Sequence, residues 1–315
     1  MICYNKYGDW IRKRFGCKVQ KISIDAGFSC PNRDGTIGKG GCIYCNNATF
    51  NPEYCTDTAG RISQEQRLNL SADNIKAQLL AGKEFFSRKY PEMKYIAYFQ
   101  SFTNTYGDPE RLCALYEDAL KRPEIVALSL GTRPDCLPGE ILSVLSFLRE
   151  KYGKEIWIEL GLQTIHDRTA RRINRGYCLP VFESSYRILK EQGFSVIIHI
   201  IYGLPGESRE DMLDTVRYIS GLDPHPDGVK LQLLHILKGT KMAEEYERDS
   251  FHILTLEEYT DLIVDSLRIL PEDVVIHRMT GDGPKGLLIA PMWSGDKKRV
   301  LNTLNRAIRN AERRS

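Results

Sequence analysis

The chain has 315 residues, of which 42% are hydrophobic and 27% are charged, and its formal net charge is +3. This composition excludes a low-complexity or fibrous chain, and so small a net charge does not determine a partner. No stretch approaches the roughly 20 apolar residues of a membrane span, and residues 1–16 lack the apolar core of a signal peptide. We therefore expect a cytoplasmic globular protein that has no membrane partner.

Short β-branched runs alternate with amphipathic helical patterns along most of the chain. The expected strands cover residues 19–27, 94–100, 124–132, 155–163, 194–203 and 228–237. The expected helices cover residues 72–90, 109–121, 138–152, 180–192 and 208–220, with Asp108 and Ser208 as N-caps. After residue 240 we expect a helix over 255–270, a short strand over 273–279 and a basic helix over 296–314.

The strict alternation of strands and helices predicts a parallel sheet with right-handed crossovers. Several strands are apolar on both faces, as expected where helices cover one face and a barrel interior lies on the other. Six βα units are too few for a closed barrel of eight. We predict an α/β fold, a partial (βα)6 TIM-type barrel with a small C-terminal α/β extension. The barrel core is expected over residues 1–240, and the extension with its basic helix over 241–315.

A group of cysteines follows the first expected strand, where the loops of a parallel barrel build an active site. Cys30, Cys42 and Cys45 lie in one glycine-rich stretch, CPNRDGTIGKGGCIYC. Together with Cys55 they could close a structural zinc centre, whereas three thiolates on a four-iron cluster leave one iron open for another ligand. The single close doublet and the position beside other polar strand ends favour the iron–sulfur site. A zinc-stabilised, non-catalytic RNA-binding protein is the alternative.

This loop, at residues 28–47, resembles the cluster loop of radical SAM enzymes, with Ile43 and the aromatic Tyr44 between the last two cysteines. The gap after Cys30 is longer than in the commonest superfamily motif and matches a branch whose core resembles the catalytic subunit of Elongator. The ordered segments YFQSFTNTYGD, LGTRPDCL, ELGLQTIHDRTARRINRGY, HIIYGLPGE and HRMTGDGPKGLLIAPMW are similar to bacterial proteins of the YtqA and YhcC type. Some of these are known as MnmL and act on the wobble uridine of tRNA.

The resemblance implies the cofactors and the residues that hold them. A 4Fe-4S cluster would be bound by Cys30, Cys42 and Cys45. S-adenosylmethionine (SAM) would bind the open iron and be cleaved reductively to a 5′-deoxyadenosyl radical. Residues expected to contact SAM are Tyr44 near the adenine, Gln100, Ser101, Thr103 and Asn104 near the methionine amino group, Glu159 and Gln163 at the ribose, Gly203, Leu204 and Pro205 at the adenine, and Arg133.

The resemblance also implies a substrate and partners. Lys238, Arg278, His199 and His235 are the candidate catalytic residues, because a carboxymethylaminomethyl-uridine substrate needs a fixed cation for its carboxylate. His277 could line the same site. The expected partners are the anticodon loop of tRNA, met by basic residues at 168–175 or 296–314, and a one-electron reductant such as flavodoxin or ferredoxin. A radical SAM enzyme with a substrate other than tRNA is a further alternative.

Overall fold

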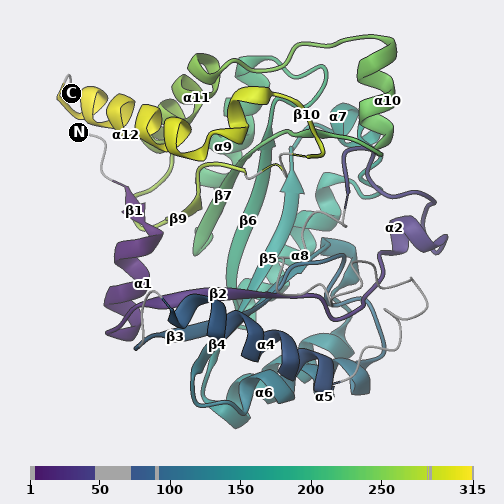
Figure 1. Cartoon of the computed structure of the whole chain (residues 1–315). Coiled ribbons are helices and arrows are strands. Elements are labelled where there is room, and N and C mark those ends of the chain that lie inside the picture. The colour runs from purple at the N-terminus through teal and green to yellow at the C-terminus, as the bar shows by residue number, and fades with distance from the viewer. Residues whose placement is uncertain (1–3, 47–71, 89–91, 282, 284–285, 314–315) are drawn as a thin grey trace.

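The structure, a computed structural model, describes residues 4–46, 72–88, 92–281, 283 and 286–313. Within them, one curled sheet of eight strands dominates the fold (Figure 1). Its strand order is β1-β9-β7-β6-β5-β4-β3-β2, and all neighbouring strands are parallel. The strands are β1 (Asn5–Lys6), β2 (Val19–Ile24), β3 (Lys94–Phe99), β4 (Ile125–Thr132), β5 (Glu155–Gln163), β6 (Ser195–Tyr202), β7 (Gly228–Leu233) and β9 (Val275–Arg278). The predicted partial barrel is confirmed.

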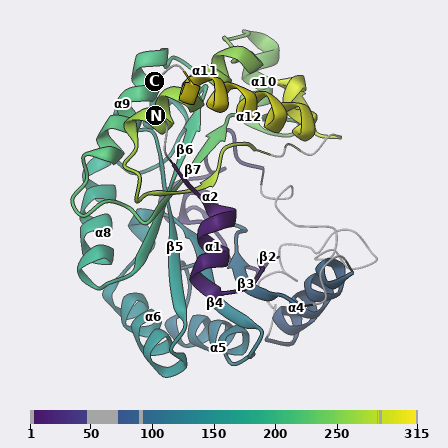
Figure 2. The same cartoon turned by 90° about the vertical axis from the view of Figure 1, so that its left-hand side faces the viewer.

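Helices cover the convex side of this sheet, as Figure 2 shows for α5, α6, α8 and α9. The longer helices are α1 (Tyr7–Phe15), α4 (Ala72–Ser87), α5 (Pro109–Leu120), α6 (Gly139–Tyr152), α8 (Leu179–Glu191), α9 (Arg209–Ser220), α11 (Leu256–Ile269) and α12 (Lys297–Arg313). Asp108 caps α5 by accepting a hydrogen bond from the Arg111 amide at 2.9 Å, and Ser208 forms a capping box with Asp211 at the start of α9. The predicted caps therefore begin these helices.

The interior of the barrel is built in layers along the strands. Its lowest layer is apolar and contains Val19, Ile96, Ala127, Trp157 and Ile197, one residue from each of five strands. Helix α1, which the sequence did not predict, closes this end: Ile11 packs in the layer, and the ring centroids of Trp10 and Trp157 lie 5.5 Å apart. Because strand side chains alternate between faces, every second residue above this layer also points into the barrel.

The C-terminal part of the chain differs in detail from the expected extension. The sixth predicted strand is interrupted after Leu233, and its remainder forms β8 (Ile236–Leu237), which pairs antiparallel with β10 (Leu288–Ala290). Strand β9, expected in the extension, pairs with β7 and continues the main sheet. A further helix, α10 (Lys241–Arg248), follows β8. One sheet therefore includes strands from both sides of residue 240. The predicted boundary between two domains at that residue stays a proposal.

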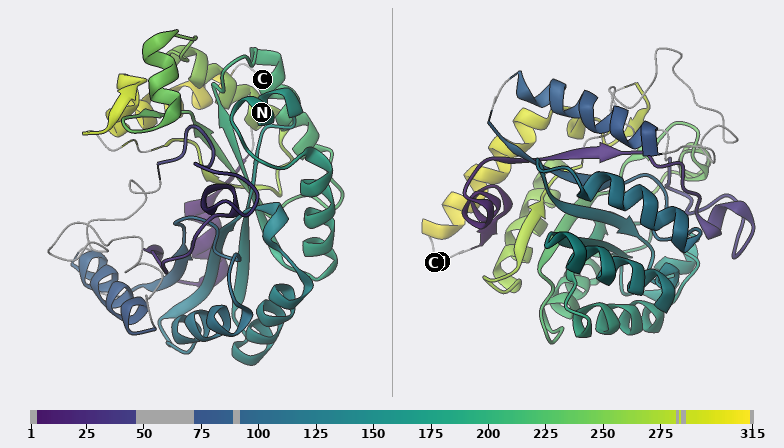
Figure 3. Two further views of the ribbon diagram at one scale, coloured as in Figure 1. Left: turned by 90° about the vertical axis from the view of Figure 1, so that its right-hand side faces the viewer. Right: turned by 90° about the horizontal axis from the view of Figure 1, so that it is seen from below.

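The curl of the sheet is incomplete. In Figure 3, α4 beside β2 stands at one end of the arc, and α11, α12 and β9 stand at the other. Among the described residues, no helix has the length and apolar character needed to cross a membrane.

Candidate active site

A cavity of about 210 Å³ lies at the carboxyl ends of the strands. It brings together many residues that the sequence singled out: Cys30, Cys42, Tyr44, Cys45, Gln100, Thr103, Arg133, Glu159, Gln163, His199 and Arg278. The described lining of this cavity does not include Ser101, Asn104, Gly203, Leu204, Pro205, His235 or Lys238. Residues from six strands, β3, β4, β5, β6, β7 and β9, therefore converge with the cysteine loop on one site.

The cysteine loop is fixed by its own backbone. The carbonyl of Cys30 accepts hydrogen bonds from the amides of Arg33 (2.8 Å) and Asp34 (3.1 Å), which forms the short helix α2 (Pro31–Asp34). The Gly41 amide donates to the Asn32 carbonyl at 2.8 Å. Gly41 has φ +80°, and a Cβ there would lie 3.1 Å from Nε of Arg33. A glycine is thus required where the loop turns back toward Cys42.

The three thiols are half-buried and close enough to affect one another. Burial raises the pKa of Cys42, and burial followed by the charge of neighbouring Cys42 raises the pKa of Cys45 to about 12. The Tyr44 side chain hydrogen-bonds to Cys42. Because iron binds thiolate sulfur, loading this site releases protons.

These residues fit a 4Fe-4S cluster. Of the described residues that line the cavity, three carry thiols, as a cluster with one open iron requires. No three of the described His, Cys, Asp and Glu side chains are grouped so that they could hold a single metal ion. A four-iron cluster places each cysteine on a different iron, so it does not need that grouping. Cys55, on which the zinc alternative depends, lies outside the described residues.

Three predicted SAM contacts occupy the cavity wall beside the cysteines. Arg133 forms a two-pronged ion pair with Asp135, at 2.9 and 2.7 Å, and its carbon Cζ lies 4.8 Å from the ring centroid of Tyr177. Gln163, at φ +62°, accepts a hydrogen bond from the Tyr177 hydroxyl at 2.9 Å. The Thr103 amide donates to the Ser29 carbonyl at 3.2 Å, which ties the loop after β3 to the cysteine loop. Their contacts with SAM remain predictions.

Other residues predicted to contact SAM are packed near the cavity but do not line it. Asn104 is fully buried and its side-chain amide donates to the Gly131 carbonyl at 2.8 Å, while Ser101 is also buried. Leu204 packs with Ile43 of the cysteine loop in a small apolar cluster. Gly203, at φ +83°, and Pro205 form the turn on either side of Leu204. The roles proposed for these residues at SAM stay predictions.

His235 and Lys238 lie apart from the cavity. The imidazole of His235 packs against Gly281, where a Cβ would come within 2.4 Å of its Cε1 atom. The carbonyl of Lys238 accepts a hydrogen bond from the Asn46 side chain at 3.1 Å. The sequence places both residues at or near the end of a single strand over 228–237. In the structure this strand ends at Leu233, and the chain changes direction before His235 and Lys238. Their catalytic roles stay predictions.

A charged layer that was not predicted from the sequence follows the apolar layer, and four of its residues form part of the cavity wall: Tyr98, Glu159, His199 and Lys230. The charged layer consists of Lys21, Tyr98, Ser129, Glu159 and His199, each two residues beyond a member of the apolar layer, together with Lys230 of β7. Glu159 is 1% exposed. Its Oε1 accepts from Lys21 at 2.5 Å and from Ser129 at 2.7 Å. Its Oε2 accepts from His199 at 2.9 Å and from Lys230.

The electrostatics of this layer follow from burial and charge. Burial opposes the ionisation of Glu159, but Lys21 and Lys230 outweigh it and hold its pKa well below the usual range. Burial and the nearby Lys21 and Arg278 lower the pKa of Lys230 to about 7, although Glu159 opposes them. Since Glu159 already has four partners, a hydrogen bond to the SAM ribose would have to share its oxygens; that role stays a prediction.

The pKa of His199 makes stability depend on pH. Burial and Lys230 lower it to about 4. A neutral ring protonated at Nε2 can donate to Glu159 and accept from Gln232 at Nδ1, 3.3 Å away. Between the ordinary pKa near 6.5 and pH 4, the unfolded chain binds this proton and the folded chain does not. The stabilisation is therefore complete above pH 6.5 and is lost as pH falls toward 4.

We expect the cluster-free wild type to lose up to about 3 kcal/mol more unfolding free energy than His199→Gln between pH 6.5 and 4. Urea unfolding followed by circular dichroism at several pH values measures this difference. His252→Gln, at an exposed position on the surface, is the matched control and should keep the wild-type pH dependence. Parallel pH profiles for the wild type and His199→Gln would contradict the assignment.

An incomplete parallel barrel with three cysteines at its strand ends defines a protein that carries an iron–sulfur cluster at the site of its chemistry. The chain belongs to the radical SAM superfamily, whose model matches residues 33–219, more than half of its length. The Radical SAM C-terminal domain model matches residues 226–310. Its cofactors are accordingly a 4Fe-4S cluster and SAM.

The relatives extend along nearly the whole chain. The protein YtqA of Bacillus subtilis (strain 168) is 40% identical over 307 residues, which are 98% of this chain and 90% of that protein. Protein YhcC of Escherichia coli (strain K12) is 37% identical over 289 residues, 92% of this chain and 87% of that protein. The family predicted from the cysteine loop and the ordered motifs is confirmed.

More distant relatives are longer proteins. A Methanocaldococcus infernus protein named tRNA uridine(34) acetyltransferase is 28% identical over 264 residues, 81% of this chain but 46% of that protein. The solved structure of M. infernus Elp3 lacking its N-terminus (residues 1–46) has a TM-score of 0.61 at 21% identity, and the match covers 78% of this chain and 61% of that chain. The structure of the E. coli radical SAM enzyme HemN has a TM-score of 0.52 at 16% identity, over 82% of this chain and 53% of that chain. These structures share the fold.

Proposed function

We propose that this radical SAM enzyme modifies the wobble uridine of tRNA by removing the carboxymethyl part of its side chain, converting carboxymethylaminomethyl-uridine to aminomethyl-uridine. The observation that supports this substrate is the similarity to a protein named tRNA uridine(34) acetyltransferase, which aligns with 81% of this chain. Bound at this site, SAM would supply a 5′-deoxyadenosyl radical. Release of the carboxymethyl group as glyoxylate, after addition of water, would be a two-electron oxidation of the substrate, and the reduction of SAM to methionine and 5′-deoxyadenosine would balance it.

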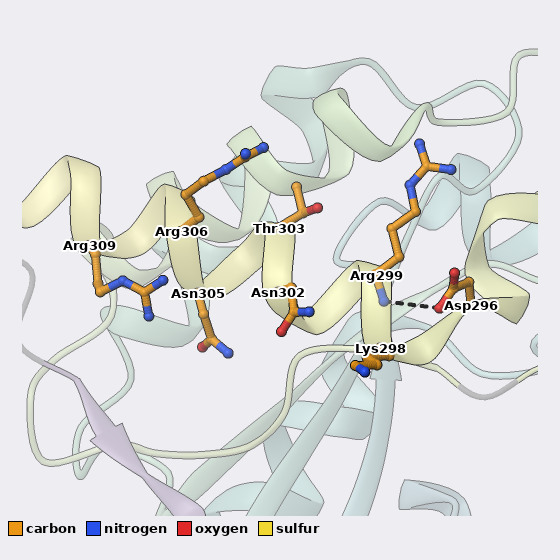
Figure 4. Close-up of a pocket in the computed structure, with 8 residues that line it drawn as sticks. All are labelled: Asp296, Lys298, Arg299, Asn302, Thr303, Asn305, Arg306 and Arg309. Carbon is orange, nitrogen blue, oxygen red and sulfur yellow. Dashed lines mark hydrogen bonds between the residues drawn. The ribbon is translucent and has the colours of Figure 1, made fainter.

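A basic face on α12 supports an RNA partner. Figure 4 shows Lys298, Arg299, Arg306 and Arg309 along this helix, with Asn302 and Asn305 between them. These side chains are exposed, and the opposite face of α12 buries Val300, Leu304 and Ile308. Cations and amides repeated along an exposed helix suit the phosphates of an RNA strand.

The arginines at 168–175, the other predicted RNA contact, are mostly engaged within the protein. Arg175 is fully buried and donates to the carbonyls of Leu162 and Thr164 at 2.6 and 2.7 Å. Arg168 pairs with Asp211 and Arg172 with Glu245, each at 2.6 Å. The basic face of α12 is therefore the stronger candidate for RNA.

A one-electron reductant is the second proposed partner. The outer part of the cysteine loop, residues 34–37, is exposed to solvent. A small redox protein of the flavodoxin or ferredoxin type could approach the cluster site on this side.

The substrate is tested by comparing tRNA nucleosides from a strain in which this gene is deleted with those from its parent. We expect carboxymethylaminomethyl-uridine to accumulate and aminomethyl-uridine and its downstream products to be lost, as measured by liquid chromatography and mass spectrometry. Complementation with the wild-type gene should restore the parental pattern, and a Cys30→Ala, Cys42→Ala, Cys45→Ala gene should not. Unchanged wobble uridines would reject tRNA and leave a radical SAM enzyme with another substrate.

A further inference from the structure

A second cavity, of about 470 Å³, meets the first inside the barrel. Tyr98, Gln100, Lys230 and Arg278 line both cavities. The second alone is lined by Tyr7, Val19, Gln20, Lys21, Ser23, Phe85, Phe86 and His277. These residues come from the edge strand β2, from β9 beside the opposite edge strand, and from α1 and α4. The second cavity therefore adjoins the cysteine site without containing any cysteine.

Positive charge exceeds negative charge where the two cavities meet. Lys21 and Lys230 both bind the single carboxylate of Glu159. Arg278 lines both cavities and lowers the pKa of Lys230 through its charge. Among the described residues that line either cavity, Glu159 is the sole carboxylate. Lys21 and Lys230 therefore share one carboxylate between them. Because a buried charge is costly unless it is paired, this arrangement favours an anionic ligand.

The neighbouring histidines do not change this balance. His199 has a pKa of about 4, and burial with the nearby Lys21 lowers the pKa of His277 well below its usual range. Both are therefore neutral at pH 7. The Tyr7 hydroxyl and His277 Nδ1 are buried and find no hydrogen-bond partner in the described part of the chain. Such orphaned polar atoms at a cavity wall are suited to the polar edge of a ligand.

Aromatic rings give the same cavity flat walls. The ammonium groups of Lys21 and Lys230 lie 4.7 and 4.5 Å from the ring centroid of Tyr98. Phe85 and Phe86 of α4 pack edge to face, with centroids 5.1 Å apart, and Tyr7 lines the wall formed by α1. Aromatic walls with a few fixed polar groups are typical of sites for a planar ring.

We propose that the second cavity is the substrate subsite and binds a planar ring that carries a carboxylate arm, with the carboxylate paired to Lys21 and Lys230. Lys21 lines this cavity and not the one that contains the cysteines, so its charge is directed to the substrate rather than to SAM. The identity of the ring as uracil rests on the proposed function; the pairing of the carboxylate does not.

An isosteric pair of small probes tests the carboxylate site. Phenylacetate and phenylacetamide have the same ring and nearly the same shape, and differ in charge. We expect the cluster-loaded, SAM-bound wild type to bind phenylacetate at least about tenfold more tightly than phenylacetamide at pH 7, as measured by ligand-observed NMR titration. Lys21→Met should remove this preference by weakening phenylacetate binding alone. Lys21→Arg, which keeps the cation, should retain most of it.

Lys13→Met is the matched control, because Lys13 is an exposed lysine on α1 outside both cavities. It should bind both probes as the wild type does. Thermal melting of Lys21→Met verifies that it is folded; if it is not, Lys21→Gln is the second variant. Equal binding of the two probes by the wild type, or a phenylacetate preference that survives in both Lys21→Met and Lys230→Met, would overturn the proposal.

The same measurement with nucleosides separates this inference from the proposed function. 5-Carboxymethyluridine and 5-carbamoylmethyluridine repeat the charged and neutral pair on a uracil ring. A Lys21-dependent preference for phenylacetate, together with unchanged tRNA nucleosides in the deletion strain, would retain the carboxylate subsite and reject the tRNA substrate. Altered tRNA nucleosides in the deletion strain, together with equal binding of the charged and neutral probes, would retain the tRNA substrate and reject the carboxylate subsite.

Discussion

Replacing Cys30, Cys42 and Cys45 together by alanine is expected to abolish iron binding and SAM cleavage. After anaerobic reconstitution with iron and sulfide, the wild type should hold about four irons per chain, and the variant should hold almost none. Production of 5′-deoxyadenosine in the presence of dithionite should fall to background, since no other described residue of the cavity wall offers a thiolate to the cluster. Iron analysis, visible absorption and chromatography of the products measure the three effects.

A matched control is Cys113→Ala, at a half-buried cysteine of α5 that does not line the cavity. It should keep wild-type iron content and cleavage. Continued cleavage by the triple variant would refute the ligand assignment. Stoichiometric zinc in wild-type protein purified without oxygen, no charge-transfer absorption, and metal retention that depends on Cys55 would instead support the zinc alternative.

The fold was predictable because its signals are local and repeated. Strands such as β6 are apolar on both faces, and Asp108 and Ser208 mark helix starts by hydrogen bonds to nearby amides. Helix α1 was not predicted, because its apolar face is short and is defined by packing against Trp157, far along the chain. The break between β7 and β8 likewise depends on pairing with β10, about fifty residues later.

The cysteine site could be predicted because three ligands lie in one segment, whereas the charged layer requires six strands to be aligned. Glu159 and His199 could be singled out because each is a polar residue in an otherwise apolar strand, and Lys230 stands out in its strand in the same way. Lys21 does not, because the strand VQKISI mixes polar and apolar residues as a strand with one solvent-exposed face does. Only the register places it opposite Glu159 across the barrel. Counting two residues beyond each apolar inward position would have found the layer.

Glu159→Ala is expected to destabilise the folded chain by about 3–5 kcal/mol near neutral pH, because it leaves Lys21 and Lys230 buried without their shared carboxylate. Lys230 can reduce this loss by releasing its proton, since its pKa is already about 7. At pH 6 the folded wild type keeps the Lys230 proton and the variant has to release it, whereas at pH 9 both folded chains have lost it, so the penalty should be largest at pH 6 and smaller at pH 9. Urea midpoints of the cluster-free protein at both pH values measure it.

Glu159→Ala could lose stability because it leaves two lysines unpaired or because it leaves an empty cavity. A variant that removes all three charges distinguishes these two causes. Glu159→Gln, Lys21→Met, Lys230→Met keeps the volume of the layer nearly constant, and should recover most of the stability, because no buried charge is left unpaired. Glu140→Gln, an exposed glutamate in the first turn of α6, should stay within about 0.5 kcal/mol of the wild type. If the triple variant is as unstable as Glu159→Ala, the charged layer does not stabilise the barrel through the pairing of its charges, and the specific packing and hydrogen bonds of its side chains do so instead. Recovery of stability with loss of phenylacetate binding would show that the two lysines are retained for the ligand and not for the fold.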